Sequence, residues 1–454
     1  MKILISSSDI ANTITNLTNG FRRLGFHADS FCTTPNKLYS NTYTYTDINF
    51  FNSCSISATV DGRVKVTPSS QFLKFIDRYD VFIFVAGTSL LPRMIDVPII
   101  KAMGKTIICR QCGTEVRDYD LANLFWAKHG RTYPFYNRDK SSKKEIIKSE
   151  LDVLELSPYN PSLANKLHNT RISELYADVI TSGPPSQTLG IRPYMQSGPI
   201  FNPSQCIFNI PKRKKPVILH APSSTLYKQT DIILNSLHEL SDNGLKFDVD
   251  FITNVPHEIV LQRLANADIL IDELSCGAGV LAYEGMASGC IVLGGHTGAE
   301  SPLPFNRPIY TITKNNIKER ITNAVNDLSF RIEMAEKGRD FINKGFGSPE
   351  NIANYLINAI KRSNSNEYDI YPTLFSENVS SLTEHDIPEY IKNITLNIIE
   401  KFGVYNQETF VNLLQAGHIA SSPTYKPDLF WDRKQLKSIG PWVTIGPTAG
   451  HGFQ

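Results

Sequence analysis

Short apolar runs alternate with stretches of helical periodicity along the first half of the chain. The predicted strands are Lys2–Ser6, Val81–Val85, Thr106–Arg110 and Ala177–Thr181, of which the last is expected to end this half. Ala11–Leu24 predicts a helix that Gly25 ends. Apolar strands separated by helices are typical of a parallel sheet with helices on both faces. The pattern therefore predicts an α/β unit.

A second alternation of the same kind begins at residue 217. The predicted strands are Val217–His220, Phe247–Ile252, Ile269–Ile271 and Ile291–Leu293, and the predicted helices are Thr230–Asp242, Pro256–Asn266 and Val280–Ser288. Helical periodicity continues from Ile317 to Arg362, and a stretch rich in Pro, Gly and Ser from Ser182 to about Pro211 predicts an interdomain linker. We expect an α/β fold of two Rossmann-like domains, residues 1–210 and 211–362, that face each other across a cleft.

The pattern changes after Ser363. One helical stripe consists of Ile387, Ile391, Ile394, Ile398 and Phe402. Because the polar side of this helix mixes charges of both signs, packing against the body of the protein is favoured over a membrane-facing role. Residues 363–454 are expected to form a mainly helical C-terminal extension of unknown role.

Composition excludes several classes of protein. With 454 residues the chain exceeds the size of one hydrophobic core, so more than one domain is expected. The formal net charge is only +2, and the lysines and arginines are spread along the sequence, so a nucleic-acid partner is not expected. No apolar run approaches the roughly 20 residues that span a bilayer. The apolar run at the start of the chain is too short for the hydrophobic region of a signal peptide. We expect a cytoplasmic protein, associated at most peripherally with the inner face of the membrane.

The cysteine pattern indicates no metal site. Seven cysteines at irregular spacing are typical of a reducing compartment. Cys109 and Cys112 form a CxxC pair, but a zinc site needs a second ligand pair, which the sequence does not offer. Two buried thiols are the favoured interpretation.

The segment from residue 267 to 289 carries the clearest signal for a ligand. A buried strand ends in Asp272-Glu273, the chain passes through Gly277 and Gly279, and a helix follows with Glu284 in its second turn. Glycines let the backbone approach a ligand closely, and the free amides of a helix N-terminus favour phosphate. This segment predicts a nucleotide site at the carboxyl end of a strand.

The run Glu284-Gly285-Met286-Ala287-Ser288-Gly289 resembles a motif of the retaining glycosyltransferases of the GT-B fold, similar to family 4, which use nucleotide sugars. The resemblance implies that Glu284 holds the ribose hydroxyls of the donor. Many members carry a second glutamate eight positions earlier, where this chain has Cys276. Asp272 or Glu273 would then replace that contact with the donor sugar.

A second resemblance lies in residues 220–230, a strand end followed by a loop and a helix. In similar proteins this loop gives an arginine and a lysine to the donor diphosphate, with a glycine after the lysine. Lys228 matches the lysine, while Thr225 and Gln229 stand where the arginine and the glycine are often found. Ser223, Thr225 and Lys228 are the implied donor contacts, and the ammonium would stabilise the leaving diphosphate. A plain surface lysine is the alternative.

A third resemblance is to the amino-terminal domain of bacterial surface-polysaccharide glycosyltransferases, in the run Gly113-Thr114-Glu115-Val116-Arg117-Asp118 after a predicted strand. It implies that Glu115 faces the cleft and takes the acceptor proton or stabilises the positive sugar carbon, and that Arg117 binds acceptor or diphosphate. An ion pair within the loop explains the two residues equally well.

Three weaker candidates remain. His296 and Thr297 follow the strand after Glu284 and would line the donor pocket, although a turn explains the neighbouring glycines as well. His220 ends a strand, and a structural role and a ligand-binding role are equally open for it.

The resemblance, which covers residues 1–362, implies transfer of a sugar from a nucleoside-diphosphate donor, UDP- or GDP-linked, to a glycan or lipid-linked glycan acceptor, with retention, in surface-polysaccharide synthesis. No metal or other cofactor is expected, because protein cations and a helix N-terminus meet the diphosphate. Two alternatives stay open. One is a nucleotide-sugar epimerase of the same architecture, and the other is a catalytically reduced binding or partner subunit, motivated by Cys276, Thr225 and Gln229.

Overall fold

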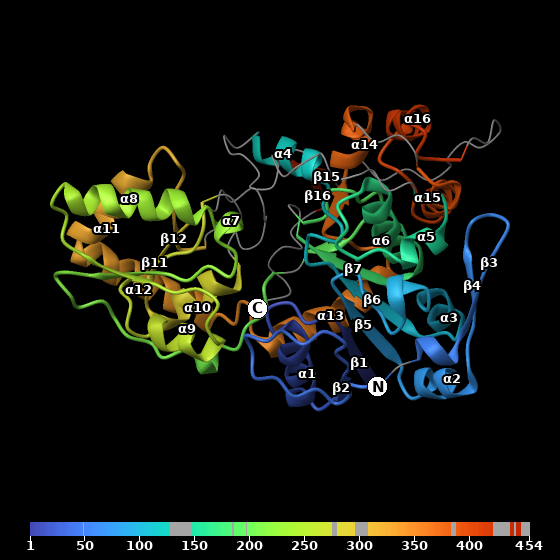
Figure 1. Ribbon diagram of the computed structural model, residues 1–454, viewed down its shortest axis with the longest axis horizontal. Helices are drawn as coiled ribbons and strands as arrows, with labels where there is room; N and C mark the ends of the chain where they lie inside the picture. Colours follow the sequence, from blue (N-terminus) through green and yellow to red (C-terminus); the bar gives the residue numbers. More distant parts are fainter. Residues whose placement is uncertain are drawn as a thin grey trace.

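The computed structural model describes residues 1–48, 50–127, 147–183, 186–196, 198–274, 279–295, 307–382 and 387–420, together with the backbone of 436–439 and 442–445. Within these ranges the chain forms two α/β units, each built on a parallel sheet (Figure 1). The first sheet has 6 strands in the order β2-β1-β5-β6-β7-β8, and the second has 5 in the order β10-β9-β11-β12-β13. The predicted fold class is confirmed.

The first unit contains the elements up to residue 196. They are β1 (Lys2–Ser7), α1 (Thr13–Arg23), β2 (His27–Ser30), β3 (Ser55–Ala58), β4 (Val64–Thr67), α2 (Ser70–Asp77), β5 (Val81–Val85), α3 (Val97–Ala102), β6 (Thr106–Arg110), α4 (Tyr119–Ala127), α5 (Glu150–Leu154), α6 (Leu163–Tyr176), β7 (Val179–Ser182) and β8 (Met195–Gln196). Strands β3 and β4 form a separate antiparallel hairpin. Strands β1, β5, β6 and β7 of the main sheet lie at the apolar runs that predicted them, whereas the short strands β2 and β8 were not predicted.

The end of the first unit differs from the prediction. Ala177–Thr181 is not its last strand, because β8 pairs with β7 beyond it. Leu189 and Arg192, which lie in the predicted linker, are 0% and 1% exposed. The Arg192 guanidinium donates to the carbonyl oxygens of Glu174 and Ala177, each at 2.8 Å. Residues 186–196 therefore belong to the first unit, and tertiary packing outweighs their loop-like composition.

The second unit contains the elements of the second sheet and the helices around it. They are β9 (Val217–His220), α7 (Thr225–Lys228), α8 (Thr230–Asp242), β10 (Asp248–Phe251), α9 (His257–Leu264), β11 (Ile269–Ile271), α10 (Val280–Ser288), β12 (Ile291–Gly294), β13 (Ile309–Thr311), α11 (Ile317–Asn326) and α12 (Leu328–Asn343). Alternate residues of β11 serve two separate cores: Leu270 packs with α9, α10 and α12, and its neighbours Ile269 and Ile271 pack with α8 and α11.

Helix α13 (Pro349–Asn364) packs against α1 in the first unit (Figure 1). Ile352 and Leu356 share one core with Ile14 and Leu17, and Arg23 pairs with Glu350 at 2.7 Å. The chain therefore crosses between the units twice, near residues 198–206 and near 345–348. At the crossings the amide of Phe201 donates to the carbonyl of Gly347 at 3.0 Å, so the two segments lie side by side.

The C-terminal extension packs on the first unit. Its described elements are β14 (Ile370–Pro372), α14 (Leu374–Asn378), α15 (Glu389–Phe402), α16 (Gln407–Gln415), β15 (Leu436–Ile439) and β16 (Trp442–Ile445). Helix α15 lies against α6, where Ile391, Ile394 and Ile398 are buried. The predicted packing of the isoleucine stripe is confirmed. Among the described helices, none combines the length and apolarity needed to cross a bilayer.

Candidate functional site

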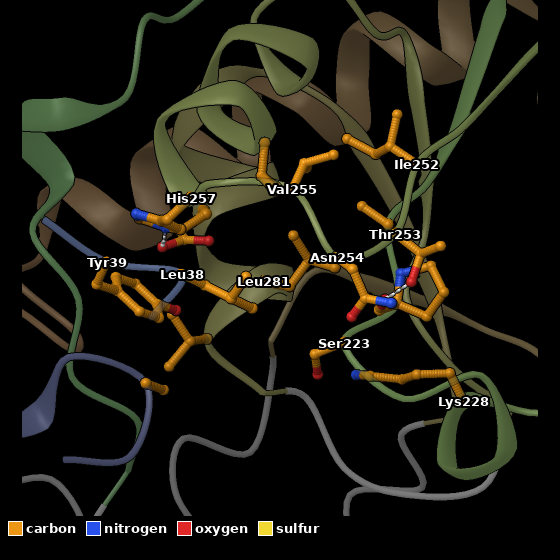
Figure 2. A pocket seen from close by; sticks show the side chains of 16 residues that line it. Leu38, Tyr39, Ser223, Lys228, Ile252, Thr253, Asn254, Val255, His257 and Leu281 are labelled. Carbon is orange, nitrogen blue, oxygen red and sulfur yellow. Dashed lines mark hydrogen bonds and ion pairs between the residues drawn. The ribbon is translucent and has the colours of Figure 1, made fainter. Parts of the chain in front are cut away.

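A cavity of about 200 Å³ lies between the two units (Figure 2). Its lining residues are Ala11, Leu38 and Tyr39 from the first unit, and Ala221, Pro222, Ser223, Lys228, Ile252, Thr253, Asn254, Val255, His257, Val260, Val280, Leu281 and Glu284 from the second. Most of the second-unit residues follow the carboxyl ends of β9 and β10 or begin helices α9 and α10. This is the place where parallel α/β sheets bind ligands.

Glu284 lies in the second turn of α10, with its side chain 6% exposed. Helix α10 begins after Gly279, whose φ of −87° is ordinary, and ends at Gly289, whose φ of 92° requires glycine. The carboxylate oxygen Oε1 accepts a hydrogen bond from His257 Nε2 at 2.7 Å. The helix therefore brings a carboxylate to the cavity, and a histidine from the neighbouring helix holds it.

His257, the first residue of α9, also contacts the first unit. Its backbone amide donates to the carbonyl of Leu38 at 2.7 Å, and its ring lies 4.5 Å from the Tyr39 ring, centroid to centroid, with 33° between the planes. In Figure 2, Tyr39 and His257 lie at one end of the pocket and Lys228 at the other, with Asn254 between them. Both units thus contribute to one end of the cavity.

Lys228 ends the short helix α7 at the other end of the cavity. Its Nζ lies 2.7 Å from Asp272 Oδ1 and 2.8 Å from Glu273 Oε2, two carboxylates that follow β11. The three side chains are 12%, 1% and 2% exposed. Gln229 then takes a left-handed conformation with φ 54°, which glycine adopts most readily, and the chain turns into α8. Lys228 is therefore not a plain surface lysine.

The ion cluster shifts the pKa values of its members. Burial alone would lower the pKa of Lys228, but Asp272 and Glu273 outweigh burial and raise it above its ordinary value of 10.5. Burial raises the pKa of Glu273 to about 7, against the opposing effect of Lys228 and with a further contribution from Asp272. Arg117 of the first unit is among the charges that lower the Glu273 pKa. Lys228 consequently stays an ammonium at neutral pH, while Glu273 titrates there.

Two of the other predicted donor contacts lie near this cluster. Ser223 lines the cavity, and Thr225 begins α7 without being among the lining residues. Gly277, His296 and Thr297, together with Cys276, lie outside the described residues. The structure therefore brings Lys228, Ser223 and Glu284 to one cavity and places Asp272 and Glu273 directly behind Lys228.

Glu115 and Arg117 lie in the loop after β6, and neither is among the residues that line the cavity. The Glu115 side chain is 1% exposed, and its carboxylate accepts the amides of Cys112 at 2.6 Å and Gly113 at 2.9 Å. Arg117 Nη2 donates to Ser186 Oγ at 3.2 Å. In this arrangement the Glu115 carboxylate holds the backbone of its own loop.

His220 has a structural environment. Its Nδ1 lies 2.8 Å from the carbonyl of Ile271 and its Nε2 lies 2.9 Å from Thr230 Oγ1, in a ring that is 0% exposed. Burial lowers its pKa. Cys109 is buried, and among the described residues no group of three or more His, Cys, Asp or Glu is arranged to hold a metal ion.

Tyr39, Asn254 and His257 are among the residues of the cavity that sequence reasoning missed. His257 follows Pro256 at the predicted start of a helix, and the strand-end position of this turn was the available signal. Asn254 follows the same strand with a φ of 54°. Tyr39 lies in an irregular loop of the first unit, far in sequence from the cavity residues of the second unit, so no local pattern indicates it.

No protein-family model matches the chain, and no curated protein matches it. Solved structures do. The catalytic domain of starch synthase IV from Arabidopsis thaliana, bound to ADP and acarbose, is similar with a TM-score of 0.45 at 11% identity, over 80% of this chain and 99% of that one. UDP-GlcNAc 2-epimerase from Neisseria meningitidis, bound to UDP-GlcNAc, is similar with a TM-score of 0.40 at 12% identity, over 80% and 100%. TarM from S. aureus is similar with a TM-score of 0.43 at 12% identity, over 68% and 63%.

Glycosyltransferases and UDP-GlcNAc 2-epimerases are therefore both among the solved structures similar to the chain. These similarities concern the fold alone.

Proposed function

We propose that the chain binds a nucleoside-diphosphate sugar in the cavity between its two units and transfers the sugar to a glycan or lipid-linked glycan acceptor. One observation carries the proposal. Glu284 and Lys228, which come from different helices and lie 56 positions apart by their residue numbers, line the same cavity. A carboxylate is suited to the ribose hydroxyls, and an ammonium is suited to the diphosphate.

The chemistry follows from the charge of Lys228. Since the pKa of Lys228 is raised, the side chain is an ammonium throughout the neutral range. Negative charge grows on the leaving diphosphate as the glycosidic bond breaks, and a positioned cation stabilises that charge in the transition state. The amino end of α10, which follows Gly279, adds its free amides beside the same cavity.

Glu273, which lies behind Lys228 and pairs with it, is proposed to replace the glutamate contact with the donor sugar. With a pKa of about 7 it exchanges a proton near neutral pH, which is the range that suits a general acid or base. On the acceptor side, Arg117 acts electrostatically on Glu273 from the first unit. We propose that Arg117 binds the acceptor or the diphosphate. We also propose that the transfer retains the anomeric configuration of the sugar.

Ligand binding is tested by thermal unfolding in the presence of UDP-, GDP- and ADP-sugars. A ligand bound only by the folded protein adds about 2.7 kcal/mol of stability at a concentration 100 times its Kd, so the Tm rises by several degrees. Glu284→Gln should remove the shift. Glu258→Gln is the matched control, because Glu258 is an exposed carboxylate on the neighbouring helix α9. Absence of any shift with all three sugars would refute the proposal.

The reaction is tested with the nucleotide sugar that binds. Transfer to an added glycan acceptor, or slow hydrolysis of the donor, should be lost in Lys228→Met and Glu284→Gln. Epimerisation of the sugar without any acceptor would instead identify the epimerase alternative. Binding without turnover, in a protein whose affinity still depends on Glu284, would identify the partner-subunit alternative.

A further inference from the structure

One segment of the first unit reaches the cavity from the opposite side to Lys228. Residues 36–43 form it, and its shape is fixed internally, since Leu38 N donates to Asn36 Oδ1 at 3.0 Å. Asp9, which follows β1 and is 3% exposed, anchors the segment because its Oδ2 accepts the Tyr43 hydroxyl at 2.9 Å and the Asn41 amide at 3.3 Å. The segment is therefore held to the body of the first unit, independently of the second.

This segment contacts the second unit through His257. The Leu38 carbonyl accepts the first amide of α9, a group that lacks a partner within its own helix. The Tyr39 ring lies against the imidazole with 4.5 Å between centroids. Both the backbone and the ring of His257 are therefore fixed by residues of the first unit.

The imidazole in turn fixes Glu284. The imidazole nitrogen His257 Nε2 donates to the carboxylate oxygen Glu284 Oε1 at 2.7 Å. In the part of the chain that the structure describes, no other hydrogen bond reaches this carboxylate. The orientation of Glu284, and with it the direction in which the second oxygen Oε2 is presented, depends on the ring of His257.

We propose that Tyr39 and His257 are positioning residues through which the first unit orients the Glu284 carboxylate for the nucleotide. The inference rests on the proposed function, since it takes Glu284 as the group that binds the donor. Donor affinity would then depend on contact between the two units, because separating them removes Tyr39 and Leu38 from His257. The first unit, expected to form the acceptor side of the cleft, would then also orient the group that binds the donor nucleotide.

The test compares the Kd of the free nucleoside diphosphate, UDP, GDP or ADP, measured by calorimetry on the full chain. His257→Ala removes the donor to a charged acceptor and should weaken binding about tenfold. His257→Gln keeps a side-chain N–H and should recover part of that loss. Tyr39→Phe keeps the ring and should bind like the wild type, whereas Tyr39→Ala should bind more weakly. His238→Ala, in an exposed residue of α8, is the matched control.

A double-mutant cycle separates positioning from general damage. If Tyr39 acts through Glu284, Tyr39→Ala should have no further effect on affinity in the Glu284→Gln background. Equal or tighter nucleotide binding by His257→Ala and Tyr39→Ala would overturn the inference, and so would additive effects of Tyr39→Ala and Glu284→Gln. Failure of the proposed function looks different, since then the wild type binds no nucleoside diphosphate, or Glu284→Gln binds it unchanged.

Discussion

Replacing Lys228 by methionine should destabilise the second unit and make its stability depend on pH in a new range. The substitution keeps most of the side-chain volume and removes the charge. Asp272 and Glu273 then lose an ammonium at 2.7 and 2.8 Å while staying 1% and 2% exposed. Two neighbouring carboxylates are then left buried without the ammonium that contacts both of them.

The size of the effect follows from burial. Breaking a buried ion pair by removing one partner costs about 3–5 kcal/mol, and we expect a loss in this range at neutral pH. In the wild type, Glu273 has a pKa of about 7 against its ordinary 4.5, so its raised pKa lowers stability as the pH rises from 4.5 to 7 and has no further effect above 7. Without the ammonium the pKa of Glu273 rises further. The variant should therefore keep losing up to about 1.4 kcal/mol per pH unit above pH 7.

The measurement is urea unfolding followed by far-UV circular dichroism, repeated from slightly acidic to slightly alkaline pH. Lys318→Met is the matched control, because Lys318 pairs with Glu239 at the surface, where both side chains are about half exposed, and should cost no more than about 1 kcal/mol. Adding Glu273→Gln to Lys228→Met should restore part of the stability, since one buried charge is removed. A loss below about 1 kcal/mol, or a loss that is the same on both sides of pH 7, would refute the reasoning.

Three further predictions follow from buried groups of the two units. Gly289→Ala should destabilise the fold by more than about 3 kcal/mol, since φ is 92° and a Cβ would lie 2.1 Å from the Asn209 carbonyl oxygen. Thermal unfolding measures the loss, with Gly244→Ala as the control, because a Cβ at the exposed Gly244 meets no neighbouring atom. His168 is 0% exposed and burial lowers its pKa to about 3 from 6.5, so wild-type stability should fall as the pH drops below 6.5, and His168→Gln should reduce that slope in urea titrations; an unchanged slope would contradict it. The Glu150 carboxylate accepts hydrogen bonds from Arg63 Nε at 2.7 Å and from Val64 N at 2.8 Å, so Glu150→Gln should lower the free energy of opening the β3–β4 hairpin by about 2 kcal/mol. Amide hydrogen exchange should become faster in residues 55–67 alone, and protection equal to that of the wild type would contradict the prediction.

Most strands and helices of the second unit from β9 to β12 were predictable because their hydrophobic pattern is local, whereas α7 and β13 were not predicted. The run Ile269-Leu270-Ile271 is buried on both faces, and Gly289 ends the helix that the pattern predicts. The sequence also allowed the prediction that Glu284 and Lys228 lie at one cavity, because the carboxyl ends of parallel strands share one edge of a sheet. Here the order of elements along the chain already determines which loops are neighbours.

The rest depends on contacts between distant parts of the chain. Residues 186–196 have the composition of a linker, but they are buried by contacts with distant parts of the chain. Arg192 donates to carbonyls of the first unit, and the Tyr194 amide donates to the Ile370 carbonyl of the C-terminal extension at 2.9 Å. Helix α13 continues a helical stretch of the second unit in sequence and packs on α1 of the first in space. Tyr39 and His257 meet across the boundary between the units. No periodicity within a window of a dozen residues carries this information.

The double crossing of the chain constrains how the two units can move. The segments at Phe201 and Gly347 are hydrogen-bonded to each other, and a Cβ at position 347 would lie 3.0 Å from the Phe201 ring. Two tethers attached at one point cannot lengthen independently, so sliding or parting of the units would have to break this junction. Rotation of one unit about this junction would leave the hydrogen bond intact, and it would change the gap between the units most at the points farthest from the junction.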